Sequence, residues 1–421
     1  MKINQITARY YITLKKSISL IEISNKLALI RLYRVKILIL SDFYLPGYKA
    51  GGPIRTLANL VDHLGDEFSF NVITKDRDFK DIKPYPSITV DKWNKLGKAR
   101  ILYCSPGNTG LSKMRYIICN TPHDLLYLNS FFSPIFTIQP LLLRRLGLIT
   151  RKPIVIAPRG EFSPGALKLK SFKKHFYLAM AKVLRLYHGV IWQASNKNEE
   201  ANIRRWFGDR VLVIIAPNLP QQIYVANYKS AHRKKTKGHL KVIFLSRISR
   251  KKNLDGALRM LKDLKGRFKF NIYGPLEDKH YWEECRNIMS SLPRNIECQY
   301  RGVVQHNQVI SVMMENDLFF LPTLGENFGH VVLEAFIASC PVLLSDQTPW
   351  RGLEKKGIGW DLPLDQPKCF QTILTKCLKM DQDEYSEWSK RARRYGLKIS
   401  QNYEAVEENR RLFYEARGMV E

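Results

Sequence analysis

Runs of consecutive apolar residues recur along the chain and alternate with stretches of helical periodicity. The first run, residues 35–40, reads Val-Lys-Ile-Leu-Ile-Leu and predicts a buried strand. A turn containing Gly51 and Gly52 follows it, and then an amphipathic helix begins. The apolar face of this helix consists of Ile54, Leu57, Leu60, Val61 and Leu64. Strand, glycine-rich turn and helix in this order are typical of the opening of a Rossmann-like domain.

The same alternation continues through the chain in two blocks. In the first block, further apolar runs predict strands at 70–74, 100–104, 125–128, 153–157, 189–193 and 211–215. In the second block, they predict strands at 241–245, 268–273, 296–300, 318–321 and 341–345. Helical stretches in this block lie at 254–264, 279–291, 305–315 and 331–338. Alternating strands and helices indicate parallel, doubly wound sheets, so we expect an α/β protein with two Rossmann-like domains facing across a cleft.

Length and local polarity suggest where the domains divide. A chain of 421 residues suits two domains of about 200 residues each. The polar, basic stretch at 220–238 is expected to be a linker, because it interrupts the apolar pattern between the two blocks. We therefore predict a basic leader at 1–34, an N-terminal domain at 35–219, this linker, a C-terminal domain at 239–382 and one long polar helix at 383–421.

Two basic, amphipathic stretches leave alternatives open. The leader has apolar side chains at helical spacing and Glu22 as its only acid, which fits a helix packed on the domain, a loose extension or a helix on a membrane surface. The second stretch, 163–189, is rich in lysine and is either a solvated helix face or a patch for anionic lipid or a lipid-diphosphate acceptor. Its apolar positions on one face are Phe172, Phe176, Ala179, Met180, Val183 and Tyr187.

The composition indicates in which cellular compartment the protein is found. No apolar run approaches the ~18–20 residues that span a bilayer, and the N-terminus lacks the pattern of a secretory signal. The 7 cysteines form no Cys-x-x-Cys pair, which favours free thiols in a reducing compartment. The histidines show no metal-binding spacing. We therefore expect a cytoplasmic protein, or one on the inner face of the cytoplasmic membrane, without a bound metal.

Charge is the unusual feature of the composition. Lys and Arg total 68 against 38 Asp and Glu, a net charge of +30, and residues 1–220 hold 35 of the basic and 14 of the acidic side chains. Such an excess attracts polyanions, which include nucleic acid, anionic lipid headgroups and diphosphate-bearing substrates. Charge alone does not choose among these partners.

The most informative motif lies at 322–335, Pro-Thr-Leu-Gly-Glu-Asn-Phe-Gly-His-Val-Val-Leu-Glu-Ala. Glu326 and Glu334 stand on either side of a turn at Gly329 that begins a helix. Backbone N–H groups at the helix start can face a phosphate, and Gly329 permits close approach. Glu334 can accept hydrogen bonds from ribose hydroxyls, and Glu326 from sugar hydroxyls. The alternative is a surface glutamate and a second one favoured by the helix dipole.

A second motif follows the predicted strand at 241–245. It reads Ser246-Arg-Ile-Ser-Arg-Lys-Lys-Asn-Leu254 and places several cations at the carboxyl end of a strand, where a helix begins. Arg247 and Lys252 are expected to hold a diphosphate and to stabilise it further as negative charge grows on the leaving group. Arg250 and Lys251 are expected to be solvated. Taken alone, such a run is more often a solvated basic loop.

Together, the two motifs resemble those of the large retaining GT-B glycosyltransferase family, family four, which includes sucrose synthases and lipopolysaccharide core transferases. The donor-domain pattern of that family is Arg-x4-Lys-Asn followed by Glu-x-Phe-Gly-x4-Glu, and this sequence matches every marked position. The resemblance extends from residue 35 onward and is most specific at 240–350. It implies a GT-B fold whose C-terminal helix crosses back to the N-terminal domain, and a nucleotide-sugar donor that is used without a metal.

The resemblance also implies roles for individual residues. Arg247 and Lys252 would bind the donor diphosphate, Glu326 the transferred sugar and Glu334 the ribose. The backbone of the helix start would contact sugar and phosphate, through Asn327, Phe328, Gly329, His330 and Val331. Gly274 and the turn at 303–304 would border the base. Gly51 and Gly52 would lie in the loop that approaches the phosphates and the acceptor.

The acceptor side departs from the family pattern. Many members have His-Gly after the strand that ends here at Ala157, and that His helps to position the donor sugar. This chain has Pro158-Arg159-Gly160-Glu161 instead. Arg159 and Glu161 are the candidates for the role of that His, although an arginine here could equally be a structural cap.

The sequence therefore predicts a retaining glycosyltransferase. It would move a hexose from a nucleotide-diphosphate sugar to a saccharide or lipid-linked acceptor, in bacterial surface polysaccharide or lipopolysaccharide biosynthesis. A sugar-nucleotide epimerase of the same fold is one alternative. A basic nucleic-acid-binding protein is another, which fits the charge but not the paired Rossmann-like units, and no recognition-helix, zinc-finger or RNP-like motif is present.

Overall fold

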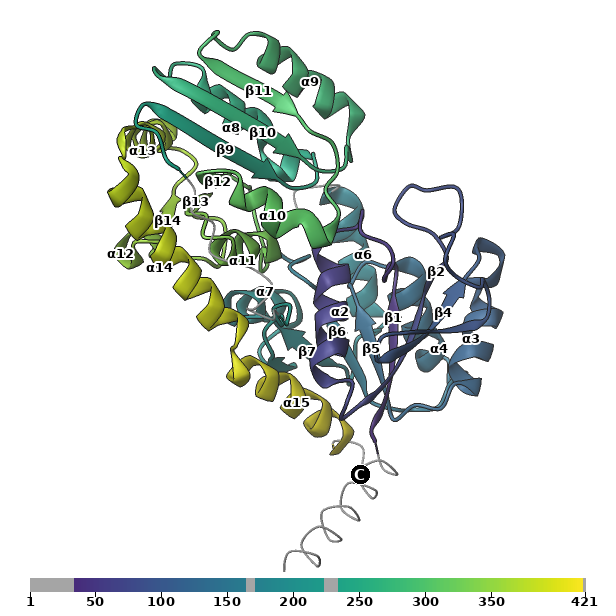
Figure 1. Ribbon diagram of the computed structural model, residues 1–421. Coiled ribbons are helices and arrows are strands. Elements are labelled where there is room, and N and C mark those ends of the chain that lie inside the picture. Colours follow the sequence, from purple (N-terminus) through teal and green to yellow (C-terminus); the bar gives the residue numbers. More distant parts are fainter. Residues whose placement is uncertain (1–33, 164–170, 223–233, 419–421) are drawn as a thin grey trace, which may run out of the picture.

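The computed structural model describes residues 34–163, 171–222 and 234–418. The leader up to residue 33, most of the predicted linker (223–233) and part of the lysine-rich stretch (164–170) lie outside the described residues. Two sheets, each with helices on its faces, form two α/β domains (Figure 1). The predicted fold class is confirmed.

The first sheet has 8 strands in the order β3-β4-β2-β1-β5-β6-β7-β8. They are β1 (Lys36–Ser41), β2 (Ser69–Lys75), β3 (Trp93–Leu96), β4 (Ala99–Cys104), β5 (Leu125–Asn129), β6 (Ile154–Ala157), β7 (Ile191–Ala194) and β8 (Leu212–Ile215). Its main helices are α2 (Gly52–Leu64), α3 (Leu111–Asn120), α4 (Gln139–Arg145), α6 (Ser171–Val183) and α7 (Lys197–Phe207). All pairs are parallel except β3 with β4.

The second sheet has 6 parallel strands in the order β11-β10-β9-β12-β13-β14. They are β9 (His239–Leu245), β10 (Arg267–Tyr273), β11 (Ile296–Tyr300), β12 (Leu318–Leu321), β13 (Val342–Ser345) and β14 (Gly359–Leu362). Its helices are α8 (Leu254–Leu261), α9 (Lys279–Ser290), α10 (Val309–Met314), α11 (His330–Ile337), α12 (Leu353–Lys356) and α13 (Pro367–Lys379). Short turns of helix, η4 (Arg250–Lys252) and η5 (His306–Gln308), precede α8 and α10.

The central strands are apolar because helices cover both of their faces. In β1 the side chains of residues 37–40 are fully buried, and in β12 so are those of residues 319–321. Continuous apolar runs are what a parallel sheet buried on both faces requires. In both sheets the strand order reverses beside the first strand, between β1 and β5 and between β9 and β12. Such a reversal opens a crevice at the carboxyl ends of the strands, where α/β proteins bind ligands.

The single helix expected at 383–421 is in fact two helices, α14 (Gln382–Ser400) and α15 (Tyr403–Gly418). Asn402 separates them, and its side chain accepts a hydrogen bond from the N–H of Ala405 at 3.3 Å, as an N-cap does. Helix α14 packs on α11, while α15 packs on the N-terminal domain, where the ring centres of Phe413 and Phe68 are 5.3 Å apart. The C-terminal helices therefore connect the two domains (Figure 1).

Candidate active site in the interdomain cleft

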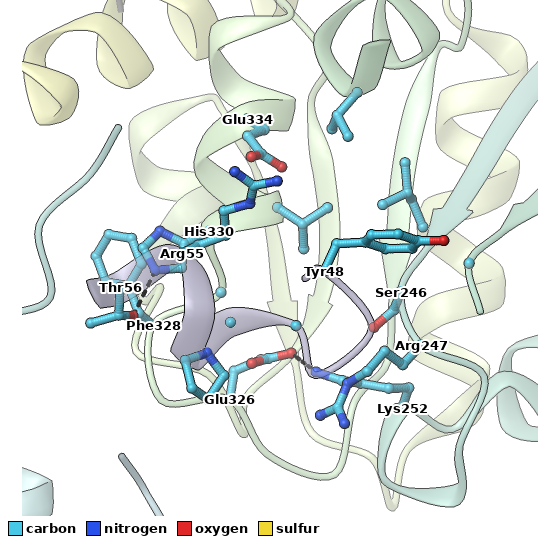
Figure 2. A pocket seen from close by; sticks show the side chains of 18 of the residues that line it. Tyr48, Arg55, Thr56, Ser246, Arg247, Lys252, Glu326, Phe328, His330 and Glu334 are labelled. Carbon is cyan, nitrogen blue, oxygen red and sulfur yellow. Dashed lines mark hydrogen bonds and ion pairs between the residues drawn. The ribbon is translucent and has the colours of Figure 1, made fainter. Parts of the chain in front are cut away.

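A pocket of about 290 Å³ lies between the two domains (Figure 2). Loops that follow β1 and β6 line it from the N-terminal domain, and loops that follow β9, β10, β11 and β12 line it from the C-terminal domain. The volume is close to the lower end of the range for small-molecule sites, ~300–1,000 Å³. The loops after β9 and β12 hold the two motifs, so neighbouring strands bring both motifs to one place.

The basic loop after β9 places two cations in the pocket wall. Lys252 is only 8% exposed, and its Nζ forms an ion pair with Glu326 Oε1, which Figure 2 marks with a dashed line. Arg247 lies beside them, and its Nη1 is 2.9 Å from Glu277 Oε2. Arg250 points away from the pocket and pairs with Glu284 at 2.5 Å. Two positive groups therefore face the pocket, as a diphosphate would require.

Lys251 does not lie where the sequence suggested. We expected it to be solvated, but it lines the pocket and is partly buried. Burial lowers its pKa, and the neighbouring charge of Lys252 lowers it further. The physical reason is the short helical turn η4, which directs Lys251 and Lys252 towards the pocket and Arg250 outward. The loop after β9 therefore contributes a third cation to the pocket.

Glu326 is held ionised by these cations. Burial alone raises the pKa of this carboxyl, but Lys252, Lys251 and Arg247 more than offset the rise and leave its pKa below the ordinary value. The N–H of Glu326 donates to the carbonyl of Gln347 at 3.0 Å, which fixes the loop. A buried carboxylate that stays charged is a strong acceptor for hydroxyl groups.

Helix α11 begins at the floor of the pocket. Gly329 precedes it with φ of 76°, and an added Cβ would lie 3.2 Å from Val332 Cγ2 and 3.4 Å from Trp350 Nε1. The Trp350 indole donates to the carbonyl of Phe328 at 2.6 Å and so holds the turn. Glycine is therefore required at 329, and the turn lets the start of α11 face the pocket, where His330 and Val331 contribute to its lining.

Glu334 lies one turn further along α11 and faces Arg55 of α2, as Figure 2 shows. Burial raises the pKa of Glu334 to about 7, although the Arg55 guanidinium acts in the opposite direction. His306 Nδ1 is 3.5 Å from Glu334 Oε1, but burial lowers the pKa of His306 to about 4, so this imidazole is neutral at pH 7. Glu334 therefore titrates close to neutrality, which is unusual for a carboxyl group.

His330 joins the two domains across the pocket. Its Nε2 is 3.0 Å from Thr56 Oγ1 of α2. Burial lowers its pKa to about 3, and the charge of Arg159 contributes in the same direction. The imidazole is consequently neutral, and it forms one hydrogen bond with the hydroxyl of Thr56, in which either group can be the donor.

Two glycines allow the backbone to come close to Arg247. An added Cβ on Gly51, where φ is 77°, would lie 3.1 Å from Arg247 Nε. An added Cβ on Gly274, where φ is 137°, would lie 1.8 Å from the carbonyl oxygen of Ser246. The glycine turn before α2 therefore closes over the cationic loop. Gly52, Gly274, Val303 and Val304 also line the pocket.

Comparison with known proteins agrees with this geometry. The family described as glycosyl transferases group 1 matches residues 227–395, which include both motifs. Residues 227–395 are therefore similar to glycosyl transferases group 1. Over 248 residues the chain is also 22% identical to an uncharacterised 41.2 kDa protein in the cps region of Klebsiella pneumoniae. That match covers 56% of this chain and 65% of the relative, slightly under two thirds of its length.

Solved structures with the same fold cover nearly all of this chain. HepE of Anabaena, solved with UDP and glucose, aligns with a TM-score of 0.64 at 16% identity, over 92% of this chain and 100% of its own. Sucrose-phosphate synthase from Thermosynechococcus elongatus aligns with a TM-score of 0.68 at 15% identity, over the same shares. WaaG, a glycosyltransferase involved in lipopolysaccharide biosynthesis, aligns with a TM-score of 0.59 at 14% identity, over 90% of this chain and 98% of its own. The fold is therefore the GT-B fold, as the sequence predicted.

The two acceptor-side candidates lie in different surroundings. Arg159 lines the pocket, but hydrogen bonds hold its guanidinium to Asn129 Oδ1 at 2.8 Å, Asn218 Oδ1 at 2.5 Å and the Tyr127 hydroxyl at 2.5 Å. Glu161 does not line this pocket. Its carboxylate accepts hydrogen bonds from the turn at 130–132, at 2.8, 2.5 and 3.3 Å. Burial raises the pKa of Glu161, partly offset by these bonds. Expecting both residues at the acceptor was therefore wrong for Glu161, which supports a turn.

Asn327, another predicted site residue, contacts the N-terminal domain. Its Oδ1 accepts a hydrogen bond from the Ser195 hydroxyl at 2.8 Å. An added Cβ on Gly160 would lie 3.1 Å from Asn327 Cβ, so the loop after β6 approaches the donor motif closely. Asn327 is thus a contact between the domains as well as part of the pocket lining.

Sequence reasoning missed several pocket residues of the N-terminal domain, among them Tyr48, Arg55 and Thr56. Arg55 and Thr56 follow the Gly51-Gly52 turn directly and lie in the first turn of α2. Their position could have identified them as pocket residues, because the first turn of a helix after a glycine-rich loop lies beside the ligand in Rossmann-like folds. Tyr48 offered no such indication, because it lies in an irregular loop.

Proposed function

We propose that this glycosyltransferase is a retaining hexosyltransferase. It moves a hexose from a nucleotide-diphosphate sugar to a saccharide or lipid-linked acceptor in the synthesis of a bacterial surface polysaccharide or lipopolysaccharide. Three similar proteins support this: HepE was solved in complex with UDP and glucose, WaaG is involved in lipopolysaccharide biosynthesis, and the Klebsiella relative lies in a cps region. The resemblance of both motifs to family four supports retention.

One observation carries the proposal. Arg247, Lys252, Glu326 and Glu334 come from separate parts of the sequence and line one pocket. Two cations suit a diphosphate, and a carboxylate on either side suits the hydroxyls of a sugar and a ribose. The apolar end of the pocket, at Val303, Val304 and Val309, suits a nucleobase.

The reaction that fits this arrangement is a same-face substitution at the anomeric carbon. The bond from that carbon to the β-phosphate oxygen breaks, and a bond from the acceptor oxygen forms on the same face of the sugar. The proton of the acceptor hydroxyl passes to the departing phosphate oxygen. Arg247 and Lys252 stabilise the negative charge as it develops there, together with the N–H groups at the start of α11.

We also propose that the reaction needs no metal ion, because the cations of the β9 loop supply the positive charge that a metal would bring. Within the residues that the structure describes, no group of three or more His, Cys, Asp or Glu side chains gathers in a way that could hold a metal. Treatment with a chelator should leave turnover unchanged. Loss of turnover on chelation and its recovery with added Mg²⁺ or Mn²⁺ would contradict this part of the proposal.

The proposed location is the cytoplasm, at the inner face of the cytoplasmic membrane. The net charge of +30 supports an anionic surface as a partner. No helix in the described part of the chain is long and apolar enough to cross a bilayer.

Incubation with a panel of nucleotide sugars tests the function. Release of the nucleoside diphosphate identifies the base and sugar, and transfer to a saccharide acceptor separates a transferase from an epimerase. The anomeric proton signal of the product, measured before it can mutarotate, shows whether configuration is retained. Donor isomerisation without release of a nucleotide would overturn the proposal, and an inverted product would overturn retention.

A further inference from the structure

Helix α6 leaves a row of large apolar side chains uncovered. Phe172 is 85% exposed, Phe176 63% and Val183 78%, and Met180 and Leu184 are exposed as well. The spacing of Phe172, Phe176, Met180 and Val183 places them on one face of the helix, and Leu184 follows directly after its last residue. We call these five residues the α6 stripe. The opposite face, with Leu178 and Ala181, is buried in the core of the N-terminal domain. The fold therefore accounts for one face of α6 and leaves the other without a partner among the described residues.

The charged residues of the segment that carries the α6 stripe are all basic. No acidic residue occurs between Glu161 and Glu199, a segment that contains the whole of α6. Lys173 and Lys182 are exposed on the helix itself. An apolar stripe flanked by lysines, without acids, is the pattern of a helix that lies in the interface of an anionic bilayer. A protein partner would need a complementary acidic rim, whereas an anionic lipid surface supplies this complement everywhere.

The position of α6 relates this face to the active site. Lys174 lies in its first turn, with Nζ 5.1 Å from the centre of the Phe132 ring. The charge of Lys174 also acts on Lys251, which lines the pocket. The start of α6 is therefore close to the pocket wall.

We propose that α6 docks on an anionic bilayer, with the apolar stripe inserted at the level of the acyl chains and Lys173 and Lys182 among the headgroups. Docking in this way brings the cleft to the lipid surface, where a lipid-linked acceptor would lie. The inference rests on the proposed membrane location and names the surface responsible for it. Residues 172–184 act as the anchor, and hydrolysis of the donor in the absence of a membrane does not depend on them.

Vesicle binding by the full-length chain tests the proposal. The vesicles contain phosphatidylcholine alone, or phosphatidylcholine and phosphatidylglycerol in equal parts, and sedimentation measures the bound fraction. One variant replaces Phe172, Phe176 and Val183 with Ser, and a second combines Lys173→Glu with Lys182→Glu. The matched controls are Ile82→Ser with Tyr403→Ser, which are similarly exposed apolar positions, and Lys368→Glu with Lys379→Glu on α13.

The wild-type chain and both controls should bind the anionic vesicles, and the two α6 variants should each lose about tenfold or more in affinity. Donor hydrolysis without vesicles should remain unchanged in the variants, which separates failure of docking from failure of the proposed reaction. Circular dichroism checks that the variants fold. Equal binding by the α6 variants and the wild type would overturn the proposal and would place the anchor elsewhere, as in the leader. Self-association through the stripe, with vesicle binding intact in its Ser variant, would overturn it as well.

Discussion

Lys252 and Glu326 depend on each other because both are buried at the pocket wall. Their side chains are 10% and 14% exposed, so neither charge is well solvated without its partner. Lys252 helps to keep Glu326 ionised, and Glu326 holds the ammonium towards the pocket. Removing one member leaves the other as an uncompensated buried charge, which is costlier than losing an exposed pair.

We predict that Lys252→Ala lowers kcat/KM by about 100- to 1,000-fold, because a preorganised group that stabilises the developing phosphate charge is lost. The matched control is Arg250→Ala, which removes a cation from the same loop but outside the pocket, and it should retain activity. Glu326→Gln keeps the shape of the side chain and should also abolish most of the transfer. Steady-state kinetics measures the loss of activity, and a thermal melt measures the loss of stability caused by the uncompensated buried charge. Wild-type turnover in either pocket variant would remove that residue from the mechanism.

Glu334 predicts how nucleotide binding depends on pH. Its pKa of about 7 means that the carboxyl is largely protonated at pH 6 and ionised at pH 8. The ionised form is the stronger acceptor for ribose hydroxyls, so nucleotide affinity should rise through pH 7, by about tenfold in all. Calorimetric titration at several pH values measures this rise in nucleotide affinity. Glu334→Gln should remove this rise and provides the baseline for the titration of the nucleotide itself.

Arg55 should shift the same profile. Its positive charge lowers the pKa of Glu334, so Arg55→Met should move the midpoint to higher pH, while Glu334→Gln with Arg55→Met should show only the titration of the nucleotide itself. An unchanged midpoint in Arg55→Met would show that Arg55 does not act on Glu334 in solution.

Among the helices, α14 determines where α11 lies. Gly396 of α14 sits directly against α11, and an added Cβ would lie 2.8 Å from the N–H nitrogen of Ile337 and 2.8 Å from Phe336 Cβ. The hydroxyl of Ser389 also donates to the carbonyl of Ser339 at 2.6 Å. Since α11 carries His330 and Glu334, contacts on its outer side influence the pocket on its inner side.

Gly396→Val should therefore destabilise the chain and weaken nucleotide binding together. Overpacking of this kind costs about 1–3 kcal/mol, and the displaced α11 would move Glu334 away from the ribose. Gly418, at the end of α15, has open space around an added Cβ, so Gly418→Val is the control and should change neither property. Thermal melts and calorimetry measure the two effects. A stable Gly396→Val chain with wild-type affinity would contradict the close packing described for α11.

Most elements could be predicted because their sequences carry strong local patterns. The buried strands are continuous apolar runs, which a parallel sheet covered on both faces demands. The missed strands lack that pattern: β3 lies at a sheet edge with exposed residues, and β14 has four residues that include a glycine and an aspartate. The break between α14 and α15 was missed although Asn402 is a typical N-cap residue, because the polar pattern continues across it.

For the candidate site, the sequence predicted which residues of the C-terminal domain meet, but it did not predict their partners in the N-terminal domain. Arg247 and Glu326 follow β9 and β12, which are neighbours at the reversal of the strand order, so their meeting follows from topology. The partners from the other domain depend on how the domains are oriented, which no local pattern encodes. Thr56 and Ser195 are of this kind. Glu161 was misplaced for a different reason: within the N-terminal domain its carboxylate is occupied by the turn at 130–132, a contact that no local pattern encodes.

Across the whole molecule, contacts between the domains converge on the donor motifs. Thr56 reaches His330 at 3.0 Å, Ser195 reaches Asn327 at 2.8 Å, and the Lys80 ammonium donates to the carbonyl of Glu277 at 2.5 Å. In addition, α15 secures the C-terminal end of the chain to the N-terminal domain, where the Asn409 amide donates to the carbonyl of Pro217 at 2.8 Å. The cleft is thus held by polar contacts around the pocket and by one helix at its far end.

The proposed reaction depends on two cations of the C-terminal domain that hold the diphosphate of the donor. Calorimetry should compare the affinity of the nucleoside diphosphate with that of its parent nucleoside, in the wild type and in Arg247→Met with Lys252→Met. The double variant should lose roughly 100-fold or more of the preference for the diphosphate, while the affinity for the nucleoside stays the same. An unchanged preference would show that these cations do not hold the diphosphate, and so would an equal loss of affinity for both ligands.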